Sequence, residues 1–245
     1  MKILVVGATG ATGQLLVKQL LERGHDVKVI VRSTGKFPEE IRTHKNIFII
    51  KAAILDMSNT DMAQHSRGCD AIACCLGHTM SFHGIFGSPR RLVTDSVRRL
   101  CHALQANNPP KPVKFVLMNS AGCSNQDIPE DVSFAQCCVI AVLRLLLPPH
   151  VDNEQAADYF RIEIGQNHPA IEWSVVRPDN LIDENTISPY KVHISPIRSA
   201  IFDPGKTSRI NVAHFMADLM SDPAIWSVWK EQMPVIYNQL THNKN

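Results

Sequence analysis

Three glycines spaced three residues apart, in Gly7-Ala8-Thr9-Gly10-Ala11-Thr12-Gly13, have the clearest chemical purpose in this chain. They follow the apolar run 3–6 and precede a helix-like stretch over 14–23. At such a junction the first glycine allows a tight turn, the second lets the backbone approach a pyrophosphate, and the third lets the helix pack on its strand. The helix N-terminus adds N–H groups and a positive dipole end. The motif predicts a dinucleotide site, or otherwise a turn that only joins strand to helix.

Arg32 and Ser33, which follow the predicted strand 26–31, lie where the adenosine ribose of a dinucleotide is expected to bind. An NAD-binding protein usually places an acidic residue here, about 20 residues after the glycines, to bind the ribose hydroxyls. This chain has an arginine instead, whose planar guanidinium suits a 2′-phosphate, and Ser33 and Thr34 add hydroxyl donors. We therefore expect NADP(H) to be preferred over NAD(H). The alternative is an arginine at a strand end that is simply solvated.

Composition and charge limit the class of protein. The 245 residues carry a formal net charge of +2, with both signs mixed along the chain, so no nucleic-acid partner is expected. The longest apolar run, 137–147, is interrupted by Arg144 and is too short to span a bilayer, so no membrane partner is expected. Seven cysteines in mostly apolar surroundings, without a C-x-x-C pair or a signal peptide, indicate a cytoplasmic protein with reduced thiols and no metal site. We expect a monomer or homodimer that binds a small-molecule acceptor, with the apolar helix over 139–147 as a subunit contact or a core helix.

Strand-like and helix-like segments alternate along the chain. This pattern predicts an α/β fold of Rossmann type, a doubly wound parallel sheet with helices on both faces, in a single domain over 1–245. Segment 188–206 is expected to be a small irregular insert that closes over the site. Ser88-Pro89 is expected to begin a helix, with the hydroxyl as its cap, and Arg98-Arg99 to lie on the solvated face of that helix. The later strands are expected at 26–31, 47–51, 70–75, 113–118 and 171–176, and a final helix presents Val212, Phe215, Met216, Leu219 and Met220 on one face.

Four segments carry a resemblance to one family: the glycine motif, Val31-Arg32-Ser33, Asn119-Ser120-Ala121-Gly122 and Val176-Arg177-Pro178. Together they resemble the atypical short-chain dehydrogenases/reductases. More narrowly, they are similar to the NmrA-like, NAD(P)H-binding group that includes biliverdin/flavin reductases. The likeness extends over most of the chain and is strongest in its first third. It implies that the glycine motif holds a pyrophosphate and that Arg32 holds the adenosine phosphate.

The same resemblance implies where further cofactor contacts lie. Asp56 and Met57, which follow the third strand, would lie near the adenine. The segment Cys75-Leu76-Gly77 would run beneath the ribose on the nicotinamide side. Ser120 and Ala121 would end the fifth strand close to the nicotinamide. Ligands of such sheets bind at the carboxyl ends of the strands, where the strand order reverses.

The Tyr-x-x-x-Lys pair of ordinary short-chain dehydrogenases is missing. In those enzymes it lies on the helix before the sixth strand, where the lysine lowers the tyrosine pKa. In residues 150–165 the only tyrosine is Tyr159, and four residues later stands Glu163, a carboxylate that would raise the pKa of the phenol. His150 and Glu154 align near the usual tyrosine and lysine places. Alcohol-ketone chemistry by the tyrosine mechanism is therefore not expected.

The catalytic residue stays unassigned among several candidates. Loop 78–87 combines aromatic faces, imidazoles and glycines, and is expected to form a lid over an acceptor pocket. The alternative is a surface connection that Phe82 and Phe86 anchor to the core. Asp179 and Asn180 either contact substrate or satisfy backbone groups of their loop. The candidates for proton donor or catalytic contact are His78, His83, His150 and Ser120.

Two functions are consistent with these residues. The first is an NADPH-dependent oxidoreductase that reduces a planar conjugated acceptor, such as a flavin or quinone, by hydride transfer. The second is a non-catalytic NAD(P)(H)-binding redox sensor of the NmrA kind. Arg32 and the aromatic loop favour the reductase, whereas the missing Tyr-x-x-x-Lys pair favours the sensor. Isomerisation of a nucleotide sugar is a weaker alternative, because it needs a tyrosine base.

Overall fold

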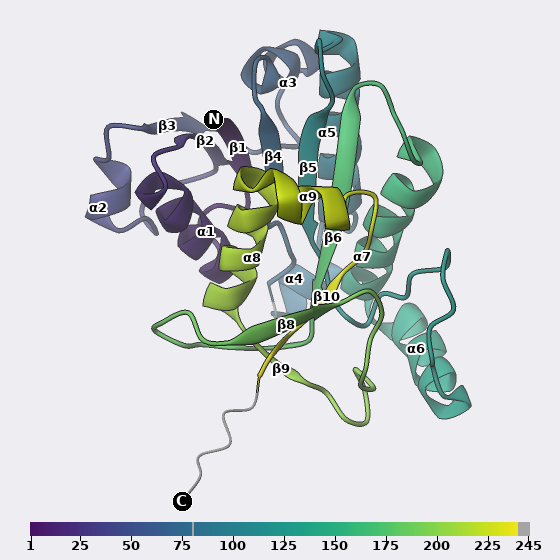
Figure 1. The fold of residues 1–245 in the computed structure, drawn as a ribbon. Coiled ribbons are helices and arrows are strands. Elements are labelled where there is room, and N and C mark those ends of the chain that lie inside the picture. The colour runs from purple at the N-terminus through teal and green to yellow at the C-terminus, as the bar shows by residue number, and fades with distance from the viewer. Residues whose placement is uncertain (80, 240–245) are drawn as a thin grey trace, which may run out of the picture.

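A mainly parallel sheet of eight strands runs through the computed structural model, which describes residues 1–79 and 81–239 (Figure 1). The strand order is β3-β2-β1-β4-β5-β6-β10-β8, and β8 at the edge runs antiparallel to β10. This arrangement confirms the Rossmann-type fold, and the strand order reverses between β1 and β4. The strands are β1 (Lys2–Val6), β2 (Asp26–Val31), β3 (Ile47–Lys51), β4 (Ala71–Cys74), β5 (Val113–Met118), β6 (Ile171–Pro178), β8 (Tyr190–His193) and β10 (Val235–Asn238).

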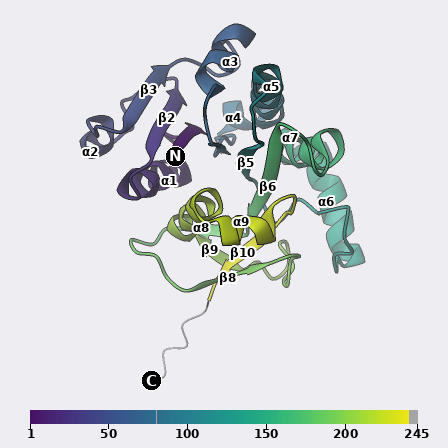
Figure 2. The same ribbon diagram turned by 45° about the horizontal axis from the view of Figure 1, so that its top comes forward.

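Helices cover both faces of the sheet (Figure 2). Because side chains alternate along a strand, Ile3 and Val5 of β1 enter one core and Leu4 and Val6 enter the other. The core with Ile3 is closed by α1 (Ala11–Glu22), α2 (Glu39–Arg42), α8 (Arg209–Ser221) and α9 (Pro223–Trp229). The core with Leu4 is closed by α3 (Asn59–Ser66), α5 (Leu92–Asn107), α7 (Pro148–Asp158) and the π-helical turn η1 (Tyr159–Ile164).

Helix α5 begins at Leu92, not at Ser88-Pro89 as its sequence predicts. The Ser88–Pro89 peptide bond is cis, and neither residue caps the helix. Instead the carboxylate of Asp152 on α7 accepts hydrogen bonds from the backbone N–H groups of Val93 and Thr94, at 2.8 and 2.9 Å. A distant residue thus satisfies the free donors of the first turn, which no local pattern reveals.

Segment 188–206 is not wholly irregular, because residues 190–193 form β8 at the edge of the main sheet. Beside it, β7 (Asn180–Ile182) and β9 (Lys206–Ser208) form a separate parallel pair. The Asp179 carboxylate accepts hydrogen bonds from the N–H groups of Asn180 and Gly205, at 2.9 and 2.8 Å. Of the two sequence interpretations of Asp179, the structure therefore supports the one in which it satisfies its own loop.

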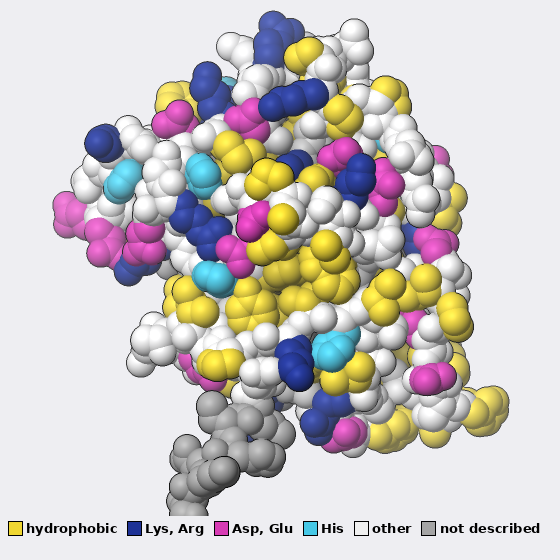
Figure 3. Space-filling model, in the orientation of Figure 1, with side chains coloured by type: hydrophobic (Ala, Val, Ile, Leu, Met, Phe, Trp, Pro, Cys, Tyr) yellow, Lys and Arg dark blue, Asp and Glu magenta, His cyan; other side chains and the backbone are white. Residues whose placement is uncertain are grey.

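Helix α6 (Phe134–Leu146) is not a core helix, although its sequence is almost wholly apolar. Of its residues Gln136 and Ile140 alone are buried, whereas Phe134 and Leu145 are each 84% exposed. Figure 3 shows hydrophobic side chains gathered at the lower right of the molecule, over this helix. Cys137 and Cys138 are exposed too, so the apolar surroundings in the sequence do not predict their position.

The guanidinium of Arg177, at the end of β6, is fully buried and joins three chain segments. It donates to the backbone oxygens of Cys123, Met233 and Ile194, at 2.8, 2.7 and 3.4 Å. It also forms an ion pair of 2.7 Å with the buried carboxylate of Glu130. These contacts fix the long loop after β5 against the segments that flank β8 and β10.

Replacing Arg177 by Met should destabilise the protein by about 3–5 kcal/mol, because it leaves the Glu130 charge buried and unpaired. Urea unfolding followed by circular dichroism measures the loss. Arg198→Met is the control, since Arg198 pairs with Asp203 at the surface, and that exposed pair contributes less than about 1 kcal/mol. Equal losses for the two variants would contradict the role given to Arg177.

Candidate functional site

The glycine segment forms the predicted turn between β1 and α1. Gly7 has a φ of +74°, a conformation that favours glycine, and a Cβ there would lie 2.3 Å from the carbonyl carbon of Cys75. A Cβ on Gly13 would lie 2.2 Å from the Gly7 oxygen, so the helix packs directly on the turn. The turn brings the sequence-predicted residues 7–13 and 75–77 together at the carboxyl ends of β1 and β4, where the strand order reverses.

The start of α1 has no side-chain cap. Gly10, which precedes the helix, uses its own N–H to donate to the Gly7 oxygen at 3.0 Å, and Gln14 donates from Nε2 to the Thr9 oxygen at 2.9 Å. Gly10 and Ala11 are exposed. By contrast, a serine hydroxyl caps each of α3, α6 and α8. An uncapped helix start at the surface, with its positive dipole end, can accept a phosphate group.

Arg32 and Ser33 lie exposed at the end of β2. Val6 pairs with Ile30 in the parallel register, so Arg32 lies just beyond the level at which the glycine turn begins. The Ser33 hydroxyl accepts a hydrogen bond from the N–H of Gly35 at 3.3 Å. Within residues 1–79 and 81–239 Arg32 forms no ion pair, which leaves its guanidinium available to a ligand.

Asp56 and Met57 lie in the loop after β3, which Arg99 of α5 holds in place. Arg99 donates from Nη1 to the backbone oxygens of Ile54 and Leu55, at 2.9 and 2.5 Å, and from Nη2 to the backbone oxygen of Met57. The prediction of a solvated Arg99 is therefore wrong. The helical pattern could not show this role, because the partners of Arg99 belong to a loop far away in the sequence.

Ser120 follows β5 and lies near His150 of α7. Asn119 accepts from the Ser120 N–H through Oδ1 at 2.8 Å and donates from Nδ2 to a backbone oxygen of α7 at 2.8 Å. The Ser120 hydroxyl accepts from the N–H of Gly122 at 3.2 Å. A Cβ on Gly122 would lie 3.6 Å from Ser120 Oγ and 3.7 Å from His150 Cε1. The serine and the histidine thus flank the same glycine, while Ala121 beside them is buried.

His150 and Glu154, which align with the usual tyrosine and lysine, contact one another on α7. Nε2 of His150 lies 3.4 Å from Glu154 Oε1, and Arg144 of α6 donates from Nε and Nη2 to the same carboxylate at 2.8 and 2.9 Å. Burial alone raises the pKa of Glu154, but the contacts with His150 and Arg144 outweigh it and lower the pKa to about 2. Glu154 is therefore a carboxylate at neutral pH, and its charge faces the His150 ring.

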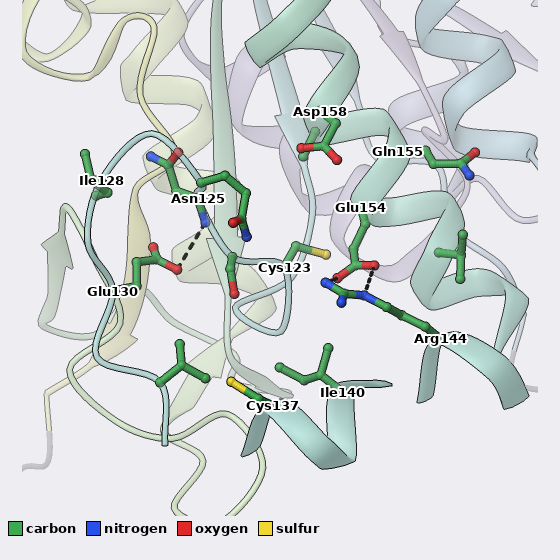
Figure 4. Close-up of a pocket in the computed structure, with 15 residues that line it drawn as sticks. Cys123, Asn125, Ile128, Glu130, Cys137, Ile140, Arg144, Glu154, Gln155 and Asp158 are labelled. Atoms are coloured by element: carbon green, nitrogen blue, oxygen red, sulfur yellow. Dashed lines mark hydrogen bonds and ion pairs between the residues drawn. The ribbon is translucent and has the colours of Figure 1, made fainter. Parts of the chain in front are cut away.

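An open cavity of about 730 Å³ lies between the loop after β5, α6 and α7 (Figure 4). Glu154 and Arg144 point toward one another across it, and Cys137 and Ile140 of α6 line its lower side. Burial raises the pKa of the Cys123 thiol, which is therefore not a thiolate nucleophile. Sequence reasoning missed this cavity. The one available signal is the length of the segment 119–133 between β5 and α6, since long loops in compact domains are often functional.

His78 is a positioning residue and not a free acid. Its Nε2 lies 2.8 Å from Asp152 Oδ2 and its Nδ1 lies 3.1 Å from the Gly84 oxygen, so both ring nitrogens have a partner within the protein. It thereby holds α4 (Phe82–Phe86) against α7. Phe82 and Phe86 contact one another, with ring centroids 5.1 Å apart, but both are exposed, so they do not anchor the loop to the core. The side chain of His83 and all of Met80 lie outside the described residues.

Tyr159, the tyrosine of the helix before β6, is a core residue. Its ring centroid lies 6.2 Å from that of Phe160, and the guanidinium carbon of Arg98 lies 5.3 Å from the Tyr159 ring centroid. Burial raises the pKa of its phenol to about 12. Tyr159 therefore stays protonated at neutral pH, and its position gives it no part in the His150 site.

Comparison with known proteins places the chain in a family. Residues 7–223 match the family model described as NAD(P)H-binding, and these residues are most of the chain. The protein therefore belongs to the NAD(P)H-binding family, which confirms at this level the resemblance seen in its sequence segments. An uncharacterised chloroplastic protein of Arabidopsis thaliana is 31% identical over 81 residues, which are 33% of this chain and 29% of that protein.

Solved structures with the same fold cover nearly the whole chain. They include the oxidoreductase ylbE from Lactococcus lactis, a short-chain dehydrogenase/reductase from Veillonella parvula in complex with NADP, and a proposed NADH-flavin reductase from Streptococcus pneumoniae. Their TM-scores are 0.67, 0.69 and 0.66, at sequence identities of 18%, 15% and 18%. Each alignment covers 98% of this chain and, in the same order, 91%, 96% and 100% of the other chain. At these identities the likeness shows the fold alone.

Glu154→Gln should change the pH dependence of stability. The folded pKa of about 2 lies below the roughly 4.3 of an unfolded glutamate, so the contribution of the carboxylate is complete above about pH 5 and is lost as the pH falls toward 2. The difference in free energy of unfolding between wild type and variant should therefore be largest at neutral pH and shrink in acid. Urea unfolding at neutral pH and near pH 3 measures it. The exposed Glu163→Gln is the control, and a Glu154 difference that does not change with pH would refute the assignment.

Proposed function

We propose that the protein is an NADPH-dependent reductase that delivers a hydride to a planar conjugated acceptor, such as a flavin or quinone. One observation carries the proposal: the glycine turn with the uncapped start of α1 follows β1, the His150–Glu154 pair lies beside the loop after β5, and β4 alone separates these two strands in the sheet. A family that binds NAD(P)H uses the first of these for the cofactor. The second supplies a proton donor and space for an acceptor.

The residues around the glycine turn fit a dinucleotide. Gly7 and Gly13 have no room for a side chain, so the turn packs tightly against the segment after β4 and against α1, whose uncapped start is exposed and available to a phosphate. The exposed Arg32, which has no ion-pair partner within 1–79 and 81–239, would bind the adenosine phosphate, and no acidic residue accompanies it in 32–35. A cation without a competing carboxylate supports a binding preference for NADP(H) over NAD(H).

Residues of the chain itself supply the proton and hold the proton donor in position. When bound, NADPH supplies the hydride. His150 donates a proton to a heteroatom of the acceptor, and the Glu154 carboxylate, 3.4 Å from Nε2, orients the His150 ring. Arg144 holds Glu154 in position through two hydrogen bonds. Ser120, which flanks the same glycine as His150, orients the acceptor through its hydroxyl.

Arg32→Ala should raise the dissociation constant for NADPH by about 10- to 100-fold, because it removes charge-assisted hydrogen bonds of about 1.5–3 kcal/mol. The dissociation constant for NADH should change little. Calorimetric or fluorescence titration measures both. Arg42→Ala, which removes another exposed arginine paired with Glu39, is the matched control. Unchanged NADPH affinity, or equal wild-type affinities for the two cofactors, would defeat the NADPH assignment.

His150→Gln should lower turnover by about 100-fold while the dissociation constant for NADPH stays unchanged, since general acid catalysis contributes roughly that factor. NADPH oxidation with flavin, quinone and dicarbonyl acceptors provides the assay. His102→Gln, an exposed histidine on α5, is the control. If His150→Gln leaves turnover unchanged, His150 is not the proton donor.

A redox sensor is the second candidate. It is favoured by the buried Tyr159 with its raised pKa, followed four residues later by Glu163 instead of a lysine. Tight binding of both oxidised and reduced cofactor, together with no NADPH oxidation by any acceptor of the panel, would select the sensor and reject the reductase.

A further inference from the structure

The charged side chains of the cavity wall limit which acceptors the cavity can hold. In the described part of the chain one cation and three carboxylates line it: Arg144, Glu130, Glu154 and Asp158 (Figure 4). A charged ligand loses water when it enters a cavity, so it needs an opposite charge that the protein does not already use. The partners of these four side chains therefore decide whether the cavity can bind an anion.

The guanidinium of Arg144 is already paired with a carboxylate. Its Nε and Nη2 donate to the two oxygens of Glu154 at 2.8 and 2.9 Å, which is the bidentate geometry that a phosphate would need from the same group. The pKa of Glu154 is about 2, so this partner stays ionised at neutral pH. An anion in the cavity would have to displace Glu154 or be bound by Nη1 alone.

The other two carboxylates of the wall pair with arginines that do not line the cavity. Glu130 forms its ion pair of 2.7 Å with the buried Arg177. Asp158 lies 3.1 Å from Nη2 of Arg161, but Arg161 also pairs with Asp127 through Nη1. Together with the Arg144 pair, three guanidinium groups serve four carboxylates. The surroundings of the cavity thus have more negative than positive charge.

The rest of the wall is uncharged. Asn125 accepts a hydrogen bond from the Asp127 N–H through Oδ1 at 3.0 Å, which leaves Nδ2 to donate to a ligand carbonyl. Cys123 is a neutral thiol, because burial raises its pKa. Apolar walls with a few hydrogen-bonding groups are typical of sites for small organic molecules. The apolar side chains of this wall include Ile128, Val132, Ile140 and Val151.

We propose that the cavity takes an uncharged planar acceptor and discriminates against acceptors that carry a phosphate. The inference rests on the proposed reductase function, since it concerns the acceptor of that reaction. A phosphate would bring about two negative charges to a place where carboxylates already outnumber guanidinium groups, and the exposed Asp131 of the same loop adds another. An uncharged ring with carbonyl groups meets no such repulsion and fits the amide and apolar groups of the wall.

Binding of riboflavin and of its phosphate ester, FMN, tests this proposal. The two molecules share one ring system and differ only in the phosphate. In flavin fluorescence titrations with NADP+ present, wild type should bind riboflavin at least tenfold more tightly than FMN. The ratio of the two dissociation constants should shrink when the ionic strength is raised from about 0.05 to about 0.5 M, because salt screens the repulsion of the phosphate.

Q155K adds a cation to the cavity wall and should bring the dissociation constant for FMN within about threefold of that for riboflavin. Gln155 is exposed on α7, so the fold should be kept, as a circular dichroism melting curve checks. The matched control is V228K. It adds the same charge on α9, at a residue that is 63% exposed and does not line the cavity, and should keep the wild-type preference for riboflavin.

Three results would overturn the proposal. The first is FMN binding as tight as riboflavin binding in wild type. The second is absence of riboflavin binding. The third is an unchanged preference for riboflavin in Q155K, because charge would then not be its cause. These titrations need no turnover, so a failure of the reductase function is seen separately, as riboflavin binding without NADPH oxidation.

Discussion

The buried guanidinium of Arg177 is the interaction on which the substrate end of this protein depends. Loops at the carboxyl ends of parallel strands have few contacts of their own, and here Arg177 binds the loop after β5 together with the segment after β8 and the segment before β10. Its partner Glu130 belongs to the loop that walls the cavity. The charge is buried at a desolvation cost, which only a complete set of partners offsets. The shape of the cavity is therefore coupled to the integrity of the sheet edge.

The parts of the fold that local pattern determines could be predicted from the sequence. The parallel strands follow from apolar runs, and the turn at Gly7 follows from glycine spacing, because both depend on near neighbours in the chain. The roles of Arg99 and Asp152 could not be predicted, since their partners lie in loops and helix ends distant in sequence. The exposure of α6 could not be predicted either, because its local sequence pattern is misleading. Its composition is typical of a core helix, and only the tertiary structure shows that little packs against it.

Helix α7 carries functional candidates on one side and a structural carboxylate on the other. Glu154 lines the cavity, where Arg144 holds it as a carboxylate, and His150, four residues earlier, lies 3.4 Å from it through Nε2. Asp152 lies between them in sequence and points to the opposite side, into the core against α5 and His78. The helical period thus places the His150–Glu154 pair and a structural carboxylate on different sides of one short segment.

The carboxylate of Asp152 also has a consequence for the order in which the chain assembles. The first turn of α5 receives its hydrogen-bond acceptors from a residue 59 positions later, so this helix cannot be completed by contacts within its own neighbourhood. By contrast, β1, α1 and β2 form a unit from adjoining segments. Closing a long loop costs conformational entropy before its contacts form. Residues 1–31 can therefore organise early, while α5 and the loop tethered by His78 reach their final geometry only after α7 has docked.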